Sequence, residues 1–407
     1  MLKAFSLAVA NLRFSGLRTA LIIAGLAVAI AILATVFLLS SAFNQGVSRN
    51  MSNIDLVAGA KGSPLQLVLS TIYQADIPTG NISAYEADLM TKDPRFASVI
   101  PLTMGDSFRG WRLVGATTAY LEQYGAELAT GRLPQADFEV VAGNRTSVPL
   151  GTKFNATHGF ADGGHQHNDH QYHVVGTLKA SGTVLDRLLI TSNKAIQESH
   201  TAHNHHDHDH SHHGHDEHDH DHEHVGQITS FLLKVKNPIA LMNLPREINQ
   251  NSSMLVVSPS YEMTRFSQTI GIGKNLFNYL GYGIGFIALT SLLMNLSSAL
   301  TTRQYDLAVL RVMGASPAVL AATIVWEAVL ITLSGTVIGL VLAHILAAIL
   351  AANIPLLANF MIPSHVLMPK LMDIWFVVAA VVAGKLAGLF PAWLAAKTDI
   401  ALLLNKR

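Results

Sequence analysis

Four separate stretches of this chain are apolar over lengths that suit a helix crossing a membrane. They run from about Leu17 to Phe43, Phe277 to Leu300, Pro317 to Ala352 and Ile374 to Ala396. A bilayer core of roughly 30 Å needs about 20 apolar residues in a helix, and a spanning segment must satisfy its backbone hydrogen bonds internally. The sequence therefore predicts transmembrane helices at 17–43, 275–300, 317–352 and 372–396.

Basic residues gather at one end of each stretch: Lys3, Arg13, Arg18, Arg303, Arg311, Lys397, Lys406 and Arg407. Lys and Arg concentrate in cytoplasmic segments beside membrane spans. The cytoplasmic parts are therefore expected at 1–16, 301–316 and 397–407, with both termini inside. The segments on the opposite side are expected at 44–274 and 353–371.

The N-terminal region allows two further alternatives. The first stretch resembles a signal peptide in its basic start and in the small residues Ser40 to Ala42 near its end. A signal h-region, however, is only about 7–15 residues long, so the longer run favours an anchor. Residues 1–16 predict an amphipathic helix on the cytoplasmic membrane surface. The alternative is a simple extension of the first span.

Residues 44–274 have the patterns of a water-facing domain of mixed class. Short apolar or alternating runs bounded by turn residues predict strands at Ala97–Leu102, Trp111–Gly115, Glu139–Val141, Tyr172–Leu178, Arg187–Thr191, Phe231–Val235 and Met254–Val257. Helical patterns occur at Ser83–Thr91, Ala119–Tyr124, Asn193–Ser199 and Pro238–Gln250. The expected fold class is thus four transmembrane helices plus an α+β domain.

Composition and missing motifs exclude several classes of function. The formal net charge is +0, so no global field favours nucleic acid. The chain has no cysteine, which excludes disulfides and thiolate metal sites. Gly59–Pro64 contains two glycines and a lysine, but neither it nor any other segment has the spacing of a phosphate-binding loop. We therefore expect no catalytic residues and no nucleotide site in this chain.

The most unusual segment is a histidine-rich insert at 199–225, which holds 13 of the 20 histidines with seven Asp or Glu residues between them. Imidazole and carboxylate groups bind Zn(II), Cu(II) and Ni(II), and such a tract is expected to be disordered because it cannot bury a core. A smaller cluster that begins at His158 precedes it. The candidate metal ligands are His165, His167, His170, His173, His200, His203, His205, His206, His208, His210, His212, His213, His215, His218, His220, His222 and His224.

We interpret this tract as a variable Zn(II)-binding segment whose affinity falls below a pH of roughly 6.5, the usual pKa of histidine. The alternative is a solvated, pH-sensitive loop with no role for metal. A catalytic zinc is not expected, because a motif such as H-E-x-x-H, with fixed ligand spacing and a general base, is absent.

Motifs at both ends of the chain are similar to those of the MacB/FtsX-like permeases, the type VII ABC transporters. Asn11-Leu12-Arg13 and Gly16–Leu21 resemble the start of that family's first span, and Trp326-Glu327-Ala328 with Gly335–Gly339 resembles its third span. The end of the fourth span is matched by Leu389–Ala392 and Ala395–Lys397. The most specific match is Arg303–Ser316, where the family has its coupling helix; its candidate contact residues are Arg303, Tyr305, Asp306, Leu307, Leu310, Arg311, Gly314, Ala315 and Ser316.

This resemblance implies a fold, partners and a location. The domain at 44–274 would be of the MacB periplasmic-core type, and the chain would lie in the inner membrane of a bacterium. Two copies of a cytoplasmic ABC ATPase would bind ATP and Mg²⁺, and the permease would form a homodimer or pair with a similar permease. A periplasmic metal-binding protein or a lipoprotein would be a further partner. Nucleotide-driven motion would then reach the periplasmic domain by mechanotransmission.

Two charged residues lie within predicted spans, Glu327 in the third and Lys385 in the fourth. Charges inside a membrane are costly and are usually paired or functional. Glu327 matches a family position, which favours a role in packing, and the two residues either pair or Lys385 extends towards the membrane surface. His344 in the third span is expected to be a polar packing residue.

Three functions remain open from sequence. The first is an ABC permease with a link to zinc transport or handling. The second is an exporter of lipoproteins, peptides or antibiotics with an incidental histidine tract. The third is a metal-responsive membrane sensor or scaffold that transports nothing.

Overall fold

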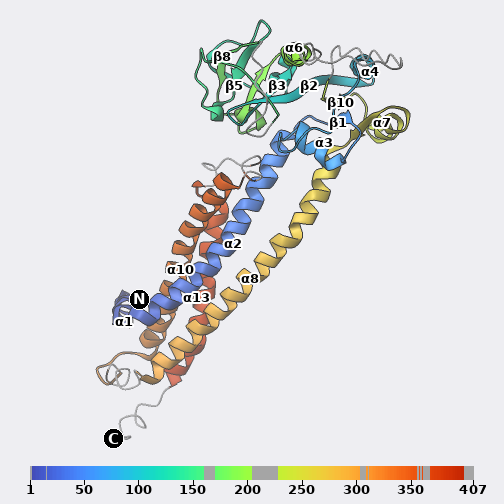
Figure 1. The fold of residues 1–407 in the computed structure, drawn as a ribbon. Coiled ribbons are helices and arrows are strands. Elements are labelled where there is room, and N and C mark those ends of the chain that lie inside the picture. Colours follow the sequence, from blue (N-terminus) through green and yellow to red (C-terminus); the bar gives the residue numbers. More distant parts are fainter. Residues whose placement is uncertain are drawn as a thin grey trace, which may run out of the picture. The chain divides into compact units, whose positions relative to one another are not determined.

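The computed structural model describes residues 2–14, 16–159, 170–203, 228–302, 309, 311–354, 357, 360 and 367–397. The chain divides into two compact units. A helical unit comprises residues 1–42, 270–358 and 362–407, and a sheet domain comprises residues 43–269 and 359–361. Figure 1 shows the elements of each unit in sequence colours.

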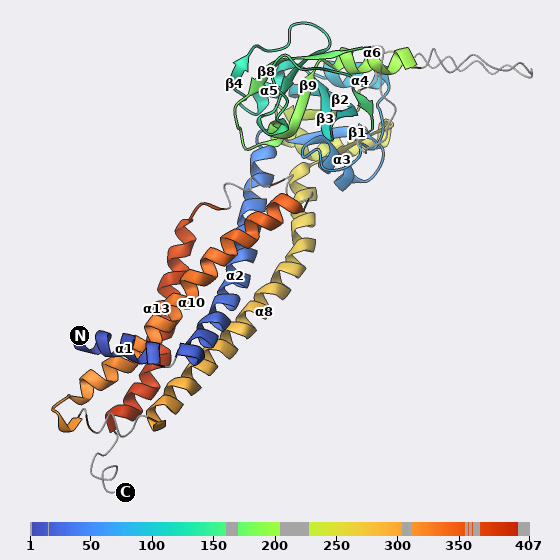
Figure 2. The same ribbon diagram turned by 60° about the vertical axis from the view of Figure 1, so that its left-hand side comes forward.

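Helices make up the described part of the first unit: α1 (Leu2–Phe14), α2 (Gly16–Asn50), α8 (Pro259–Thr302), α10 (Pro317–Asn353) and α13 (Leu371–Lys397). Four of them are long and apolar enough to cross a membrane, over Gly16–Asn50, Pro259–Asn295, Pro317–Asn353 and Leu371–Trp393. Each of the four predicted spans lies within the full length of one of the helices α2, α8, α10 and α13. The helix at the N-terminus is separate from α2 and packs against α10 (Figure 2). Its Ala4 and Ala8 are buried.

Glycines allow these helices to approach each other closely. A Cβ added at Gly339 on α10 would lie 2.7 Å from the carbonyl oxygen of Ala27 on α2. A Cβ added at Gly384 on α13 would lie 2.9 Å from the Cα of Val329 on α10. Small residues are common at helix interfaces in membranes, because they let two backbones come into contact. The packing of α10 against α2 and α13 therefore depends on these glycines.

The second unit is built on an 11-stranded sheet whose main path runs β11-β1-β10-β2-β3-β9-β5-β8-β4. Its strands are β1 (Leu56–Ala60), β2 (Phe96–Phe108), β3 (Trp111–Ala116), β4 (Leu128–Gly131), β5 (Glu139–Ala142), β6 (Lys153–Phe154), β7 (Thr157–His158), β8 (Tyr172–Leu178), β9 (Leu188–Thr191), β10 (Ser230–Val235) and β11 (Met254–Val257). Two pairs are parallel, β3 with β9 and β5 with β8, and the others are antiparallel. Two-residue strands lie off the main path, where β6 pairs with β8 and β7 with β2.

Helices and two apolar cores complete this domain. Its helices are α3 (Pro64–Thr71), α4 (Ala84–Lys92), α5 (Thr118–Gln123), α6 (Asn193–His203) and α7 (Pro238–Asn251), with 3₁₀ turns at Asn144–Thr146 and Val184–Arg187. One core includes Leu56, Phe231 and Leu244, and the other includes Val174 and Ile196. The expected class, four apolar helices plus an α+β domain, is confirmed.

The start of the histidine-rich insert and the position of Arg187 differ from the sequence predictions. The predicted disordered insert at 199–225 begins inside α6, which continues to His203. The reason is that the start of this segment packs on the sheet: Ser199 is buried, and its hydroxyl donates to Ile196 and Asp106. Residues 204–225 lie outside the described residues. Arg187, predicted to begin a strand, instead ends a 3₁₀ turn before β9.

Candidate metal centre

The site begins at an irregularity in the longest strand. Within β2 the pairing with β3 shifts between Met104 and Asp106, so Gly105 is an extra residue in the ladder. Such bulges bend a strand and redirect the side chains beside them. Here Asp106 follows the bulge and is fully buried.

A short strand brings the first histidine to this carboxylate. In the antiparallel pair of β2 and β7, His158 lies directly opposite Asp106, and Thr157 lies opposite Ser107. The backbone after His158 is fixed to β2 as well, because Gly159 donates to Gly105 at 2.7 Å and accepts from the Ser107 hydroxyl at 2.7 Å. Directly opposite residues in an antiparallel pair have neighbouring side chains, so this pairing positions His158.

The second histidine comes from α6, which packs against β2 and β3. This helix is held through Ile196, which is fully buried in the second apolar core. His200 lies one turn further along, and its ring sits close to the bulge. A Cβ added at Gly105 would be 3.3 Å from His200 Nε2, so glycine at this position leaves room for the ring.

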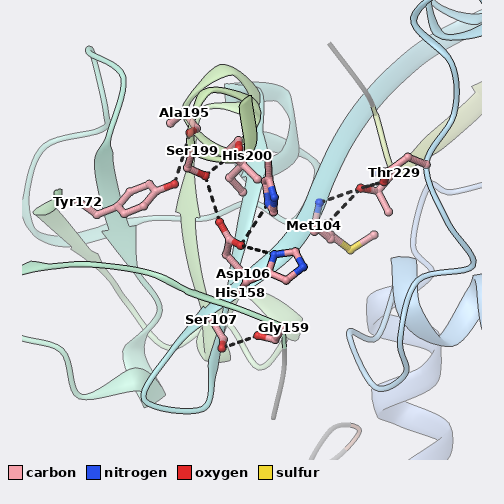
Figure 3. Close-up of polar contacts among 12 residues, drawn as sticks. Met104, Asp106, Ser107, His158, Gly159, Tyr172, Ala195, Ser199, His200 and Thr229 are labelled. Carbon is pink, nitrogen blue, oxygen red and sulfur yellow. Dashed lines mark hydrogen bonds and ion pairs between the residues drawn. The ribbon is translucent and has the colours of Figure 1, made fainter. Parts of the chain in front are cut away.

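Figure 3 shows the resulting cluster of Asp106, His158 and His200. Asp106 Oδ1 lies 3.2 Å from His200 Nε2 and 3.6 Å from His158 Nδ1. The three possible ligand atoms lie within 4.8 Å of one another, and the two rings are 5.0 Å apart in an edge-on arrangement. His158 is exposed and His200 partly exposed, so an ion could reach the group from solvent.

Neighbouring polar groups position the carboxylate. The Ser199 hydroxyl lies 3.3 Å from Asp106 Oδ2, the oxygen that does not face the histidines. Tyr172 is fully buried next to this group, and its hydroxyl donates to the carbonyl of Ala195. Burial raises the pKa of Tyr172 above its ordinary value, and the nearby Asp106 adds to the rise. The tyrosine is therefore neutral and acts as a fixed dipole.

Some of the predicted metal ligands lie on α6, some lie in or next to β8, and the others are outside the described residues. On α6, His200 belongs to the cluster and His203 is the last residue of the helix. His170 stacks on Phe138 with ring centroids 4.5 Å apart, and His173 lies in β8 opposite Glu139 and Lys153. The remaining candidates lie outside the described residues: His165, His167, His205, His206, His208, His210, His212, His213, His215, His218, His220, His222 and His224.

Two members of the cluster are absent from the ligands predicted from sequence. His158 was recognised as part of the smaller histidine cluster but was not among those ligands. Asp106 was missed because the predicted strand ended at Leu102, whereas β2 continues to Phe108. One feature of the sequence could have indicated Asp106: it is a carboxylate in the stretch Met104-Gly105-Asp106-Ser107-Phe108, directly after a predicted strand. An ionised residue within a buried strand requires a partner.

The predicted coupling segment is described only in part. Arg303, Tyr305, Asp306, Leu307 and Leu310 lie outside the described residues. At its end, Gly314 has a φ of +96°, and Ser316 caps the next helix by accepting from the amide of Val319 at 3.4 Å. A glycine with positive φ is common just past a helix end, and proline is favoured at the first position of a helix, so the chain stops one helix at Gly314 and starts α10 at Pro317.

The polar residues predicted within the spans have identifiable surroundings. Glu327 on α10 accepts a hydrogen bond from the Asn11 amide of α1 at 2.5 Å, beside an edge-on contact of Phe5 with Trp326. Lys385 is exposed on α13. His344 Nε2 lies 3.1 Å from Asp373 Oδ2, and Asp373 also accepts from the amide of Lys370 before α13.

Two family models match the chain. The MacB-like periplasmic core domain matches residues 19–250, and the FtsX-like permease C-terminal domain matches residues 278–400. A comparison with curated proteins gave no match.

Two solved structures are similar in part. The periplasmic region of MacB from Actinobacillus actinomycetemcomitans is 15% identical, with a TM-score of 0.33, and the match covers 55% of this chain and 97% of that one. The extracellular domain of the noncanonic ABC-type transporter YknZ from Gram-positive bacteria is 11% identical, with a TM-score of 0.30, over 50% and 99% of the two chains.

Four apolar helices combined with a mixed sheet domain define a membrane protein with a folded domain outside the bilayer. The family models account for both parts, and the first alone matches more than half of the sequence. The chain therefore belongs to the MacB/FtsX-like permeases of ABC transporters.

Proposed function

We propose that this chain is the membrane subunit of a transporter that is driven by a separate ABC ATPase and that handles zinc. The observation that carries the first part is the pair of family matches, one over the sheet domain and one over the last three long helices. The chain contains no phosphate-binding loop, so ATP and Mg²⁺ would bind to the partner.

The proposed coupling contact is the segment Arg303–Ser316, between α8 and α10. A short cytoplasmic segment joining two long helices can transmit a push from the ATPase to both of them. Among the chain connections between the units, those at residues 42–43 and 269–270, within α2 and α8, would carry this motion to the sheet domain. Transport would then need no pathway for zinc through the helices.

The link to zinc rests on the side chains of the histidine-rich insert, which are of the type that binds Zn(II). Carboxylates alternate with many of the histidines, so several ions could bind along the tract without fixed geometry. The tract would collect zinc for transport, sense it or pass it to a partner. An incidental tract on an exporter of another substrate is the competing function.

The test uses the permease purified with its co-expressed ATPase in nanodiscs, where ATP turnover is measured with and without Zn²⁺. We expect the permease to alter turnover and Zn²⁺ to change it further. Tyr305→Ala and Leu310→Ala should weaken the coupling, whereas Val337→Ala, at an exposed position on α10, should not. If the two proteins neither co-purify nor affect each other's activity, the permease proposal is wrong.

Deleting residues 204–227 tests the zinc link separately. If the link is right, the deletion should remove the response of turnover to Zn²⁺ and impair growth under zinc limitation or excess, while assembly with the ATPase persists. Normal growth and an unchanged response would favour the exporter with an incidental tract.

A further inference from the structure

We propose that Asp106, His158 and His200 form a fixed binding site for one Zn²⁺ ion, separate from the histidine tract, and that this ion clamps α6 and β7 to β2. The inference deepens the zinc link, and its physiological role rests on the proposed function. The binding itself does not, because it depends only on the geometry of the sheet domain.

The donor atoms of the cluster suit a zinc ion. Two imidazoles and one carboxylate are a known protein ligand set for Zn²⁺, in which the fourth position is held by water or another donor. Neutral imidazole also suits Cu(II) and Ni(II), so the class of ligand is a divalent transition metal, and Zn²⁺ is the member we test.

The spacing of these atoms also suits a zinc ion. With bonds of 2.0–2.2 Å, ligand atoms around a tetrahedral zinc ion lie about 3.3–3.6 Å apart. The carboxylate oxygen of Asp106 lies 3.2 Å and 3.6 Å from the nearest nitrogens of His200 and His158. All three atoms fall within 4.8 Å of one another. The adjustment that remains is the distance between the two imidazole nitrogens, and the exposed His158 ring can turn to make it.

The fold holds the carboxylate in place. A fully buried carboxylate is costly unless its charge is compensated, yet the bulge at Gly105 directs Asp106 towards two imidazoles. The Ser199 hydroxyl contacts its other oxygen, and hydrogen bonds of this kind orient a carboxylate that binds a metal. Three elements distant in sequence, β2, β7 and α6, each supply one ligand from a backbone position fixed by the sheet or the apolar core.

The position of the ligands in the chain suggests the role of the ion. His158 lies two residues before the segment 160–169, and His200 lies four residues before the segment 204–227. These two segments contain most of the other histidines. Zinc bound at the cluster would therefore fix the chain just before each of these two segments, and it would join a strand pair to a helix.

The experiment uses the full chain in nanodiscs with residues 204–227 replaced by a short Gly-Ser linker and with His165 and His167 changed to Gln. Zn²⁺ binding is measured by titration calorimetry, and Co²⁺ is added as a spectroscopic probe. We expect one ion per chain and a cobalt absorption spectrum typical of tetrahedral coordination. At 100-fold excess over Kd, Zn²⁺ should raise the melting temperature of the domain by about 5–10 °C.

Single substitutions in this background identify the ligands. Asp106→Asn, His158→Gln and His200→Gln should each weaken Zn²⁺ binding by more than about 100-fold, and Ser199→Ala should weaken it by roughly 10-fold. His173→Gln in β8 is the matched control and should bind as the parent does. Melting temperatures without metal show whether each variant is folded.

Two outcomes would overturn the proposal. One is a folded tract-deleted chain that binds no Zn²⁺ stoichiometrically, which would leave the cluster as a carboxylate that pairs with two imidazoles. The other is parent-like affinity in folded His158→Gln and His200→Gln variants. Either result would leave the permease function intact, because coupling to the ATPase is measured separately by nucleotide turnover.

Discussion

Several buried polar residues of the sheet domain stabilise it by completing the hydrogen bonds of backbone groups. Asn50, at the end of α2, is almost fully buried, and its side-chain oxygen accepts from the amide of Val184 at 2.7 Å. Its side-chain nitrogen donates to the carbonyl of Gly46, and its own carbonyl accepts from the Tyr124 hydroxyl. One side chain thus joins a helix end to the 3₁₀ turn before β9.

Replacing Asn50 by Ala should therefore destabilise the domain. The amide of Val184 would remain buried without its acceptor, which costs about 1–3 kcal/mol. Thermal unfolding of the full chain in detergent would measure the loss. Asn144→Ala at an exposed position is the control and should change little; equal effects from both variants would contradict this role for Asn50.

The pair of Arg132 and Glu139 predicts a dependence on pH. The Arg132 guanidinium donates to Glu139 and, with the backbone amides of Gln135 and Ala136, lowers the pKa of that carboxyl to about 2. Because the pKa of Glu139 is lower in the folded than in the unfolded state, the ionised carboxylate stabilises the domain at pH values above about 4.5. This stabilisation is lost as the pH falls from about 4.5 towards 2. Arg132 is exposed, so water screens the pair and its contribution should be small.

Arg132→Ala tests this dependence. The variant should unfold at a lower temperature than the parent at pH 7, and the difference should shrink as pH falls towards 2. Melting curves collected across that range would show it. A difference that stays constant with pH would mean that the substitution acts through packing and not through the carboxylate.

At the scale of elements, the helical unit depends on close backbone contacts and the sheet domain on one irregular strand. Gly335 and Gly339 on α10 face α2, while Gly384 and Gly388 on α13 face α10. In the sheet domain β2 runs for 13 residues and pairs with β10, β3 and β7. The bulge in this strand both shifts the register of the ladder and brings Asp106 to the candidate metal site.

Gly384→Leu should disrupt the packing of α13 on α10. An added Cβ would already collide with the backbone of Val329, and overpacking of this kind costs about 1–3 kcal/mol or more. Lower yield of folded protein and a lower melting temperature in detergent are the expected results. Gly283→Leu on α8, where an added Cβ meets nothing within 4 Å, is the matched control and should remain folded.

At the scale of the whole molecule, the proposed function requires the sheet domain and the segment Arg303–Ser316 to face opposite sides of the membrane. The basic residues beside the four apolar helices predict this topology. Because the chain has no cysteine, single cysteines can report the side directly without other changes to the protein.

Lys92→Cys, at an exposed position on α4, and Val312→Cys, at an exposed position within the coupling segment, provide this test. A membrane-impermeant maleimide should label Lys92→Cys in intact spheroplasts and Val312→Cys only after the membrane is permeabilised. Labelling of both without permeabilisation would place them on the same side and exclude coupling to a cytoplasmic ATPase at this segment.

How much the sequence could predict differs between the two units and the site. The length of the apolar stretches alone predicted four helices, and each lies within α2, α8, α10 or α13. The alternation of apolar and polar residues predicted strands such as β8, in which every second residue is buried. The two-residue strands β6 and β7 were missed because they are too short for periodicity to emerge. The site was predicted only through His200, since imidazole-rich composition marks ligands but not their partners.

The sequence by itself determined that this chain has four long apolar helices, an α+β domain and the motifs of a permease, because these depend on local patterns of hydrophobicity and on short motifs. Only the tertiary structure decided that Asp106 meets His158 and His200. Those residues lie on three elements that are far apart in the chain, and the bulge at Gly105, the pairing of β7 with β2 and the packing of α6 bring them together. Such contacts follow from strand pairing and packing, which no local pattern in a single sequence specifies.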